Sequence, residues 1–343
     1  MAPRLIVHAG SHKTGTTALQ RHFSAHREEL RRAGLHYPDP SPEFGGQSAN
    51  HVPVVAALVR GNDDDRARIA AFAARLAEAP ERHILLSAET LYRLAADGVS
   101  HKEEGFWPAR ARLLERLRES FAGFDLSYLL VLRRPDRLAE AHYAETIAAT
   151  EAAPSFADHL GQKPYRYQYR RQMDLFAASG PTSVLCYEAA VQQGLVSSIS
   201  AAIDLPLIGE PPASVRPSVG VRAQCWLREA KLGEGARPRR DRRWRFALER
   251  GDLAPFDGPP VSLWPGQEAR AAFVSAALAD VESPAFSPVP APEPPPVTWD
   301  AAAQARAEAA FAEWEAQNEP RLAARDAAGL RPFEPDLAPS QEP

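Results

Sequence analysis

The stretch Gly10–Thr17, which reads GSHKTGTT, carries residues suited to binding phosphate. Gly10 and Gly15 keep the spacing of a Walker A phosphate loop, but Thr16 stands where that loop has its lysine. The lysine lies upstream, at Lys13. A glycine turn before a helix directs backbone amides and the helix dipole at an anion. The sequence therefore predicts a phosphate loop made of Gly10, Ser11, His12, Lys13, Thr14, Gly15, Thr16 and Thr17.

Two arginines, Arg133 and Arg134, follow the apolar run Ser127–Leu132. Magnesium-dependent nucleotide hydrolases place an aspartate at the end of a second apolar strand. Two cations at the end of this apolar run, in place of a metal-binding aspartate, favour a nucleotide ligand that bears an extra phosphate and is bound without a metal. A solvated strand end or an ion pair is the alternative for Arg133. We expect no metal site, since His22 and His26 share a helical face but have no evident third ligand.

Two residues are candidates for a general base near the loop. His51 lies where a Gly/Ser/Asn-rich loop enters a helix, and it could equally be a helix cap or a surface residue. Glu89 follows an apolar run, at the carboxyl end of a strand where α/β sheets bind ligands. It could instead begin a helix over 90–96. The two alternatives stay open, with a slight preference for His51.

Alternating apolar runs and helical patterns predict the elements that carry these residues. The expected strands are Leu5–Ala9, His83–Ser87, Ser127–Leu132 and Thr182–Tyr187. The expected helices are Thr16–Ala33, Val52–Arg60, Arg66–Ala79, Ala109–Phe121, Asp136–Thr150, Tyr169–Ala178, Leu195–Ile203 and Trp299–Ala324. This order predicts a P-loop-like three-layer α/β fold with a central, mostly parallel sheet and a helical C-terminal part.

Composition sets further limits. The chain has 343 residues, a net charge of −4 and 45% hydrophobic residues, so we expect a globular protein without nucleic-acid partners. No signal-peptide core or membrane-length apolar run is evident, which predicts a cytoplasmic protein. We expect an α/β domain over 1–281, with acceptor-side helices mainly over 205–281. A Pro-rich linker over 282–298 and a C-terminal helix and tail over 299–343 follow.

Three motifs occur in the order KTGTT, LRRPDRLAEAHY and SVRPSVG along the chain, and they resemble those of the PAPS-dependent sulfotransferases. The similarity is to the bacterial sulfotransferase-like branch and covers the chain broadly. It implies sulfuryl transfer from PAPS to a hydroxyl or amine, with release of PAP and no need for a metal. It also implies that Lys13 to Thr17 bind the 5′-phosphosulfate and that Lys13 is catalytic, because it stabilises charge on the bridging oxygen.

The same resemblance implies that Arg133 and Arg216 bind the donor's 3′-phosphate. Ala141 stands where the family pattern has a serine, so one hydroxyl donor to that phosphate is missing. The alternatives are a P-loop kinase-like phosphotransferase that uses ATP and a non-catalytic PAP-binding or PAPS-binding protein. The acceptor would be a small metabolite, a glycan or a lipid. The basic cluster Arg237–Arg245 could recruit an anionic acceptor or be a solvated helix face.

Overall fold

The computed structural model describes residues 2–11, 13–46, 48–98, 103–207, 209, 219–233, 237–251, 256–281, 286 and 294–332. It divides into two compact units. Unit 1 comprises residues 1–138, 163–215 and 273–289, and unit 2 comprises residues 139–162, 216–272 and 290–343. The expected linker over 282–298 lies largely outside the described residues, so the predicted boundaries at its ends stay a prediction.

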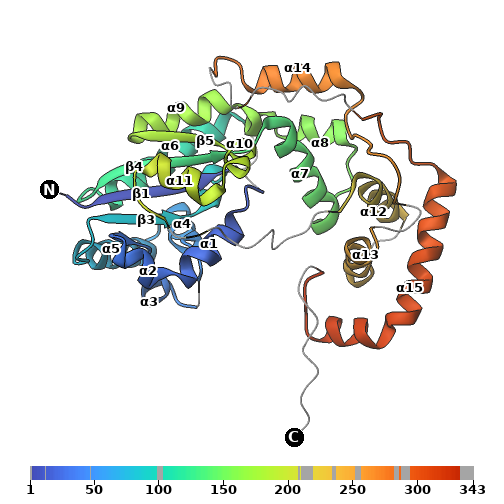
Figure 1. The fold of residues 1–343 in the computed structure, drawn as a ribbon, viewed down its shortest axis with the longest axis horizontal. Helices are drawn as coiled ribbons and strands as arrows, with labels where there is room; N and C mark the ends of the chain where they lie inside the picture. Colours follow the sequence, from blue (N-terminus) through green and yellow to red (C-terminus); the bar gives the residue numbers. More distant parts are fainter. Residues whose placement is uncertain are drawn as a thin grey trace, which may run out of the picture. The chain divides into compact units, whose positions relative to one another are not determined.

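Unit 1 is built on a five-stranded sheet, as drawn in Figure 1, with the order β2-β3-β1-β4-β5 and every pairing parallel. The strands are β1 (Arg4–Gly10), β2 (Leu35–His36), β3 (His83–Ser87), β4 (Asp125–Leu132) and β5 (Thr182–Cys186). The four expected strands and the parallel sheet are confirmed. The short edge strand β2 was not expected, because two residues leave no periodic signal in the sequence.

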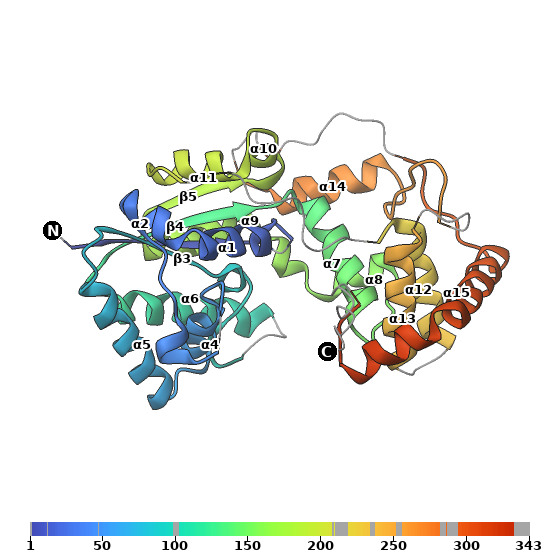
Figure 2. The same ribbon diagram turned by 60° about the horizontal axis from the view of Figure 1, so that its bottom comes forward.

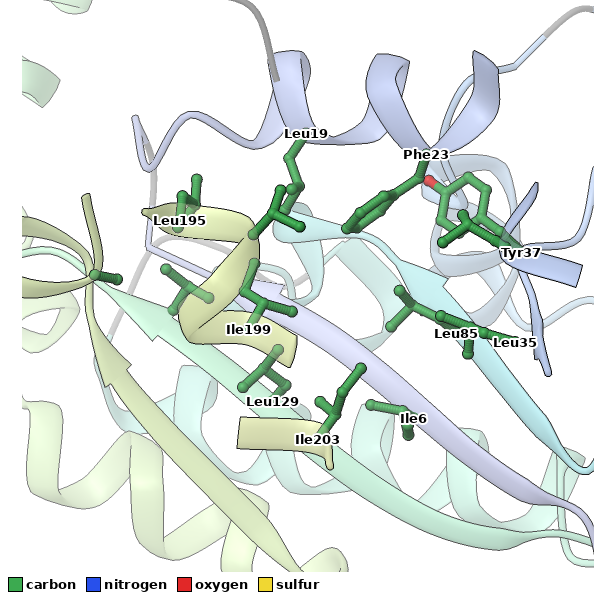
Figure 3. Close-up of a cluster of buried hydrophobic side chains, with 14 residues drawn as sticks. Ile6, Leu19, Phe23, Leu35, Tyr37, Leu85, Leu129, Leu195, Ile199 and Ile203 are labelled. Carbon is green, nitrogen blue, oxygen red and sulfur yellow. The ribbon is translucent and has the colours of Figure 1, made fainter. Parts of the chain in front are cut away.

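One face of the sheet is covered by α1 (Thr16–Ala25), α2 (Arg27–Arg32), α10 (Tyr187–Gln192) and α11 (Leu195–Ile203). Figure 3 shows Leu19 and Phe23 of α1 and Ile199 and Ile203 of α11 over this face. The strand residues that meet them are Ile6, Leu85, Leu129 and Val131. These alternate along each strand with residues of the opposite face, as the pleat of a sheet requires.

The third layer lies on the opposite face. Phe176 of α9 (Tyr169–Ser179) contacts Tyr128 of β4, with 5.1 Å between the ring centroids. The other helices of this part of unit 1 are α4 (Val52–Arg60), α5 (Asp63–Ala77) and α6 (Glu103–Ser120). The short elements are α3 (Ser41–Phe44), η1 (Glu89–Tyr92), η2 (Ala96–Gly98) and η3 (Pro164–Tyr167). The three-layer α/β fold is therefore as predicted.

Several helices differ in their bounds from the expectation; α6 begins at Glu103 rather than Ala109, and α15 (Ala301–Ala327) ends at Ala327 rather than Ala324. The helix expected over Thr16–Ala33 is two helices, because His26 leaves the helical conformation and its ring nitrogen Nδ1 bonds the carbonyl of His22 at 2.8 Å. Helix α5 begins at Asp63 rather than Arg66. The side chain of Asn62 caps it by accepting from the Asp65 amide at 2.8 Å, and acidic residues favour a helix N-terminus.

Unit 2 is helical. Its members include α8 (Phe156–Gln162), α12 (Val221–Gly233), α13 (Arg237–Glu249) and α15 (Ala301–Ala327). The bounds of α7 are Pro135–Ala149 and those of α14 are Gln267–Ala277, and both helices cross a unit boundary. Helices α12, α13 and α15 lie side by side (Figure 2) around an aromatic core. That core is formed by Trp226, Phe246, Phe256, Phe311 and Trp314.

Candidate active site

The expected phosphate loop joins β1 to α1. Gly10 must be glycine because a Cβ there would lie 2.8 Å from the Val131 carbonyl oxygen of β4. Lys13 and Gly15 both adopt left-handed backbone conformations, with φ of 64° and 66°. Thr14 Oγ1 donates to the Ser11 carbonyl at 3.0 Å and closes the turn. Gly15 is the N-cap of α1, so the first amides of that helix, which have no acceptor within it, point toward the loop.

Arg133 lies against this loop at the end of β4. Its guanidinium Nη1 donates to the Lys13 carbonyl at 3.3 Å, and its backbone amide donates to Ser11 Oγ at 2.6 Å. The guanidinium also lies over the ring of Tyr187, 5.7 Å from the centroid. The carboxyl ends of β1 and β4 are neighbours in the sheet, and this adjacency brings the two predicted cations, Lys13 and Arg133, to one place.

Glu188 is a site residue that the sequence reasoning missed. Its carboxylate accepts from Arg133 Nε at 3.1 Å and from the Arg134 amide at 2.9 Å. The Arg133 side chain is 24% exposed, so the ion pair with Glu188 leaves part of this side chain accessible to solvent. Glu188 follows β5, and the rule that pointed to Glu89 could have found it. Arg134 instead forms a buried ion pair with Asp136 at 2.9 Å.

Glu89 begins the turn η1 directly after β3. Its carboxylate accepts a hydrogen bond from the Thr16 hydroxyl, at the first residue of α1. Glu89 is half-buried, and it therefore combines contact with the loop and partial access to solvent. Glu89 and the loop are thus brought together, although η1 is a 3₁₀ turn of four residues rather than the helix considered over 90–96.

His51 lies in a different environment. It is 1% exposed, and its Nε2 donates to the Pro38 carbonyl at 2.9 Å while its Nδ1 accepts from the Ser87 amide at 2.9 Å. Burial lowers the pKa of the imidazole to about 4, although the two backbone hydrogen bonds oppose this shift. Both ring nitrogens are used by backbone groups, so this geometry disfavours the predicted role of His51 as a base.

Other expected residues are not tested by these contacts. His12 and Arg216 lie outside the described residues. Ala141 belongs to unit 2, so its place in a 3′-phosphate site with Arg133 stays a prediction.

The basic cluster Arg237–Arg245 lies in α13, where its described arginine side chains form ion pairs within unit 2. Arg242 contacts Glu315, Glu319 and Asp326 of α15. Arg240, Arg243 and Arg245 pair with Glu151, Glu308 and Glu249. These four described arginines therefore join α13 to α15 and to its neighbours, rather than forming a solvated face.

Two general features bear on the class of site. Within the described ranges, no group of three or more His, Cys, Asp or Glu side chains is arranged to hold a metal ion. None of the described helices combines the length and the apolar character that a membrane span requires.

Comparisons with known proteins give one structural likeness. No protein-family description matches the chain, and no curated protein matches its sequence. A solved structure titled "Crystal Structure of Sulfotransferase from Alicyclobacillus acidocaldarius" is similar, with 17% identity and a TM-score of 0.36. The likeness covers 75% of this chain and 99% of that chain. It is too low to carry an argument about the reaction. The fold itself defines a three-layer α/β protein in which a glycine-containing turn joins β1 to α1.

Proposed function

We propose that the protein is a sulfotransferase, which moves a sulfuryl group from PAPS to a hydroxyl or amine and releases PAP. The observation that carries the proposal is the contact between the loop and the end of β4. Arg133 Nη1 donates to the backbone carbonyl of Lys13, so two residues with cationic side chains, from two strand ends, meet at one glycine turn. A donor with a 5′-phosphosulfate and a separate 3′-phosphate matches two neighbouring cationic groups.

In this proposal the loop holds the 5′-phosphosulfate through its amides and the N-terminus of α1. The acceptor oxygen or nitrogen attacks sulfur while the bond from sulfur to the bridging oxygen breaks. The electron pair of that bond stays on the phosphate of PAP, where the ammonium of Lys13 stabilises the charge. Catalysis of this kind depends mainly on positioning and fixed charge.

The acceptor's proton passes to Glu89. Its carboxylate contacts Thr16 of the loop and is half-buried, whereas both nitrogens of His51 are engaged by backbone groups. A general base must lie within reach of the proton that it takes, so Glu89 is the better candidate. Arg133 binds the 3′-phosphate. Arg216 is proposed to assist it on the motif alone.

The first test is calorimetry with PAP and with Mg-ATP. Tight binding of PAP without magnesium is expected, and binding of Mg-ATP alone would overturn the proposal. In transfer assays with labelled PAPS and a panel of small-molecule, glycan and lipid acceptors, Lys13→Met should lower the rate about 10²- to 10³-fold. Lys163→Met is the matched control. PAP binding with no transfer to any acceptor would favour the binding-only alternative.

Glu89→Gln separates the two candidate bases. Glutamine keeps the shape of the side chain and an oxygen that can accept from Thr16, but it takes no proton. We expect the rate to fall about 10²- to 10⁴-fold with PAP affinity kept. A Glu89→Gln enzyme with wild-type turnover would exclude Glu89 as the base.

One observation favours a second function, phosphoryl transfer from Mg-ATP. The Glu89 carboxylate and the Thr16 hydroxyl lie together beside the loop, and magnesium prefers oxygen ligands of this kind. The displaced lysine and Arg133 argue for the first function. The calorimetric comparison described above decides between the two.

A further inference from the structure

Arg110 of α6 is a buried cation that has no acidic partner among the residues that the structure describes. It is fully buried, and within those residues its guanidinium donates to neutral acceptors. These are the carbonyls of Leu91 and Leu94, the latter at 2.7 Å, and Gln172 Oε1 at 3.3 Å. Its Nη2 has no hydrogen-bond partner among the described residues. Burying a charge without a counter-charge is costly, so a packing role would be better served by methionine or leucine.

The groups that Arg110 holds belong to the segment that carries the candidate base. Leu91 lies in η1, two residues after Glu89, and Leu94 follows shortly after. The near end of this turn is fixed by the hydrogen bond from Thr16 to Glu89. Arg110 fixes the far end through backbone carbonyls. The position of the Glu89 carboxylate therefore depends on α6 as well as on the loop.

The partner of Arg110 on α9, Gln172, connects this turn to Arg133. Gln172 and Tyr169 are three residues apart on α9, so they share one helical face, and both are buried. The Tyr169 hydroxyl donates to the Arg133 carbonyl at 2.5 Å. The amide of the same residue, Arg133, donates to Ser11 Oγ in the loop at 2.6 Å.

These contacts form a closed ring within unit 1. It runs from Thr16 to Glu89, through η1 to Arg110 and Gln172, along α9 to Tyr169, and through Arg133 to Ser11. We propose that α9 couples the base to the cation of the 3′-phosphate, with Arg110 and Tyr169 as positioning residues. This inference rests on the proposed function. It means that a nucleotide seated at Arg133 also orders Glu89.

The coupling predicts that each positioning residue affects the distant half of the site. Arg110→Met should raise the Kd for PAP about three- to ten-fold, although Arg110 bonds the turn of Glu89 and Gln172 of α9 rather than Arg133. Tyr169→Phe should lower kcat at saturating PAPS about three- to ten-fold, although its hydroxyl bonds the Arg133 carbonyl and Ser11 of the loop rather than Glu89. Arg110→Lys should restore part of the affinity, because lysine can donate to the same carbonyls.

Two variants are matched controls. Tyr37→Phe removes a hydroxyl that donates to the Ala49 carbonyl at 2.8 Å in unit 1, from a side chain that packs on the face of the sheet opposite α9. Arg325→Met removes a buried arginine that donates to the Arg331 carbonyl at 2.8 Å in unit 2. If Arg110→Met changes only kcat and Tyr169→Phe changes only affinity, each residue acts locally and the coupling is wrong. Effects no larger than those of the controls would overturn the positioning roles.

Amide hydrogen exchange of the ligand-free protein separates this inference from the proposed function. Arg110→Met should accelerate exchange over 133–138, and Tyr169→Phe should accelerate it over 89–94, with the global unfolding free energy little changed. If each substitution accelerates amide exchange in the distant segment but the wild type binds no PAP, the proposed function is wrong and the coupling through α9 is supported. Faster exchange confined to the residues around each substituted side chain would overturn the proposed coupling through α9.

Discussion

At the scale of residues, the backbone of the loop is as specific as its side chains. Lys13 adopts φ of 64°, a left-handed conformation that costs a non-glycine residue on the order of 1 kcal/mol. Strain of this kind is found where function requires it, and here it directs the Lys13 carbonyl to Arg133. The backbone of Lys13 is therefore part of the hydrogen-bonded structure of the loop.

Gly15 gives a residue-scale prediction. Its φ is 66°, and an added Cβ would lie 3.3 Å from the Tyr187 hydroxyl. We expect Gly15→Ala to lower the free energy of unfolding by about 1 kcal/mol and to weaken PAP binding at least ten-fold. Urea unfolding and calorimetry measure the two effects. Gly123→Ala, where nothing lies within 4 Å of the new Cβ, should change neither quantity appreciably. Unaltered PAP affinity in Gly15→Ala would place the ligand elsewhere.

At the scale of elements, ion pairs join α13 to α15 beside the aromatic core that the two helices share. Arg242 contacts three carboxylates of α15, and its side chain is 16% exposed. Charges that share a partly buried network contribute more than isolated surface pairs. Intramolecular ion pairs thus account for the described arginine side chains of α13, Arg240, Arg242, Arg243 and Arg245.

Arg242→Met should therefore destabilise unit 2. We expect a loss of about 2 to 3 kcal/mol, because three carboxylates lose their shared cation. Arg306→Met, an exposed position on α15, is the control and should lie within about 0.5 kcal/mol of the wild type. Chemical unfolding followed by tryptophan fluorescence suits this test, since Trp226 and Trp314 lie in the core of unit 2. A wild-type midpoint for Arg242→Met would show that the network contributes nothing.

At the scale of the whole molecule, two buried histidines make stability depend on pH. Burial lowers the pKa of His8 and of His51 to about 4, from the ordinary 6.5. The unfolded chain therefore binds protons at a higher pH than the fold does. Because the fold buries both histidines in their neutral form, their full contribution to stability is present above about pH 6.5. This contribution is lost as the pH falls toward 4.

Each histidine accounts for a loss on the order of 3 kcal/mol between these limits. The urea midpoint should fall steadily from pH 7 to pH 5, and His8→Asn should reduce the steepness of that fall. His8 Nδ1 bonds Ser87 Oγ at 2.9 Å, so a polar replacement keeps a partner for that hydroxyl. A midpoint that stays constant from pH 7 to pH 5 would contradict this prediction.

The sequence determined the features that depend on local order along the chain. The apolar runs around Ile6, Leu85 and Leu129 predicted buried parallel strands, and the glycines at 10 and 15 predicted the turn between β1 and α1. Both signals come from neighbouring residues, through periodicity and backbone freedom. The carboxyl-end rule placed Glu89, and its position after an apolar run placed Arg133, at the edge of the sheet where the loop lies.

Only the tertiary structure decided which side chains at that edge have partners. The sequence favoured His51 as base, but its two ring nitrogens bond Pro38 and Ser87, which are 13 and 36 residues away. Glu188 reaches Arg133 across 55 residues, and Arg110 reaches Gln172 across 62. Hydrogen bonds between residues so distant in the chain depend on how strands and helices pack. No local sequence pattern encodes these hydrogen bonds. The loop could therefore be predicted from the sequence, but the partners of His51, Arg133 and Arg110 could not.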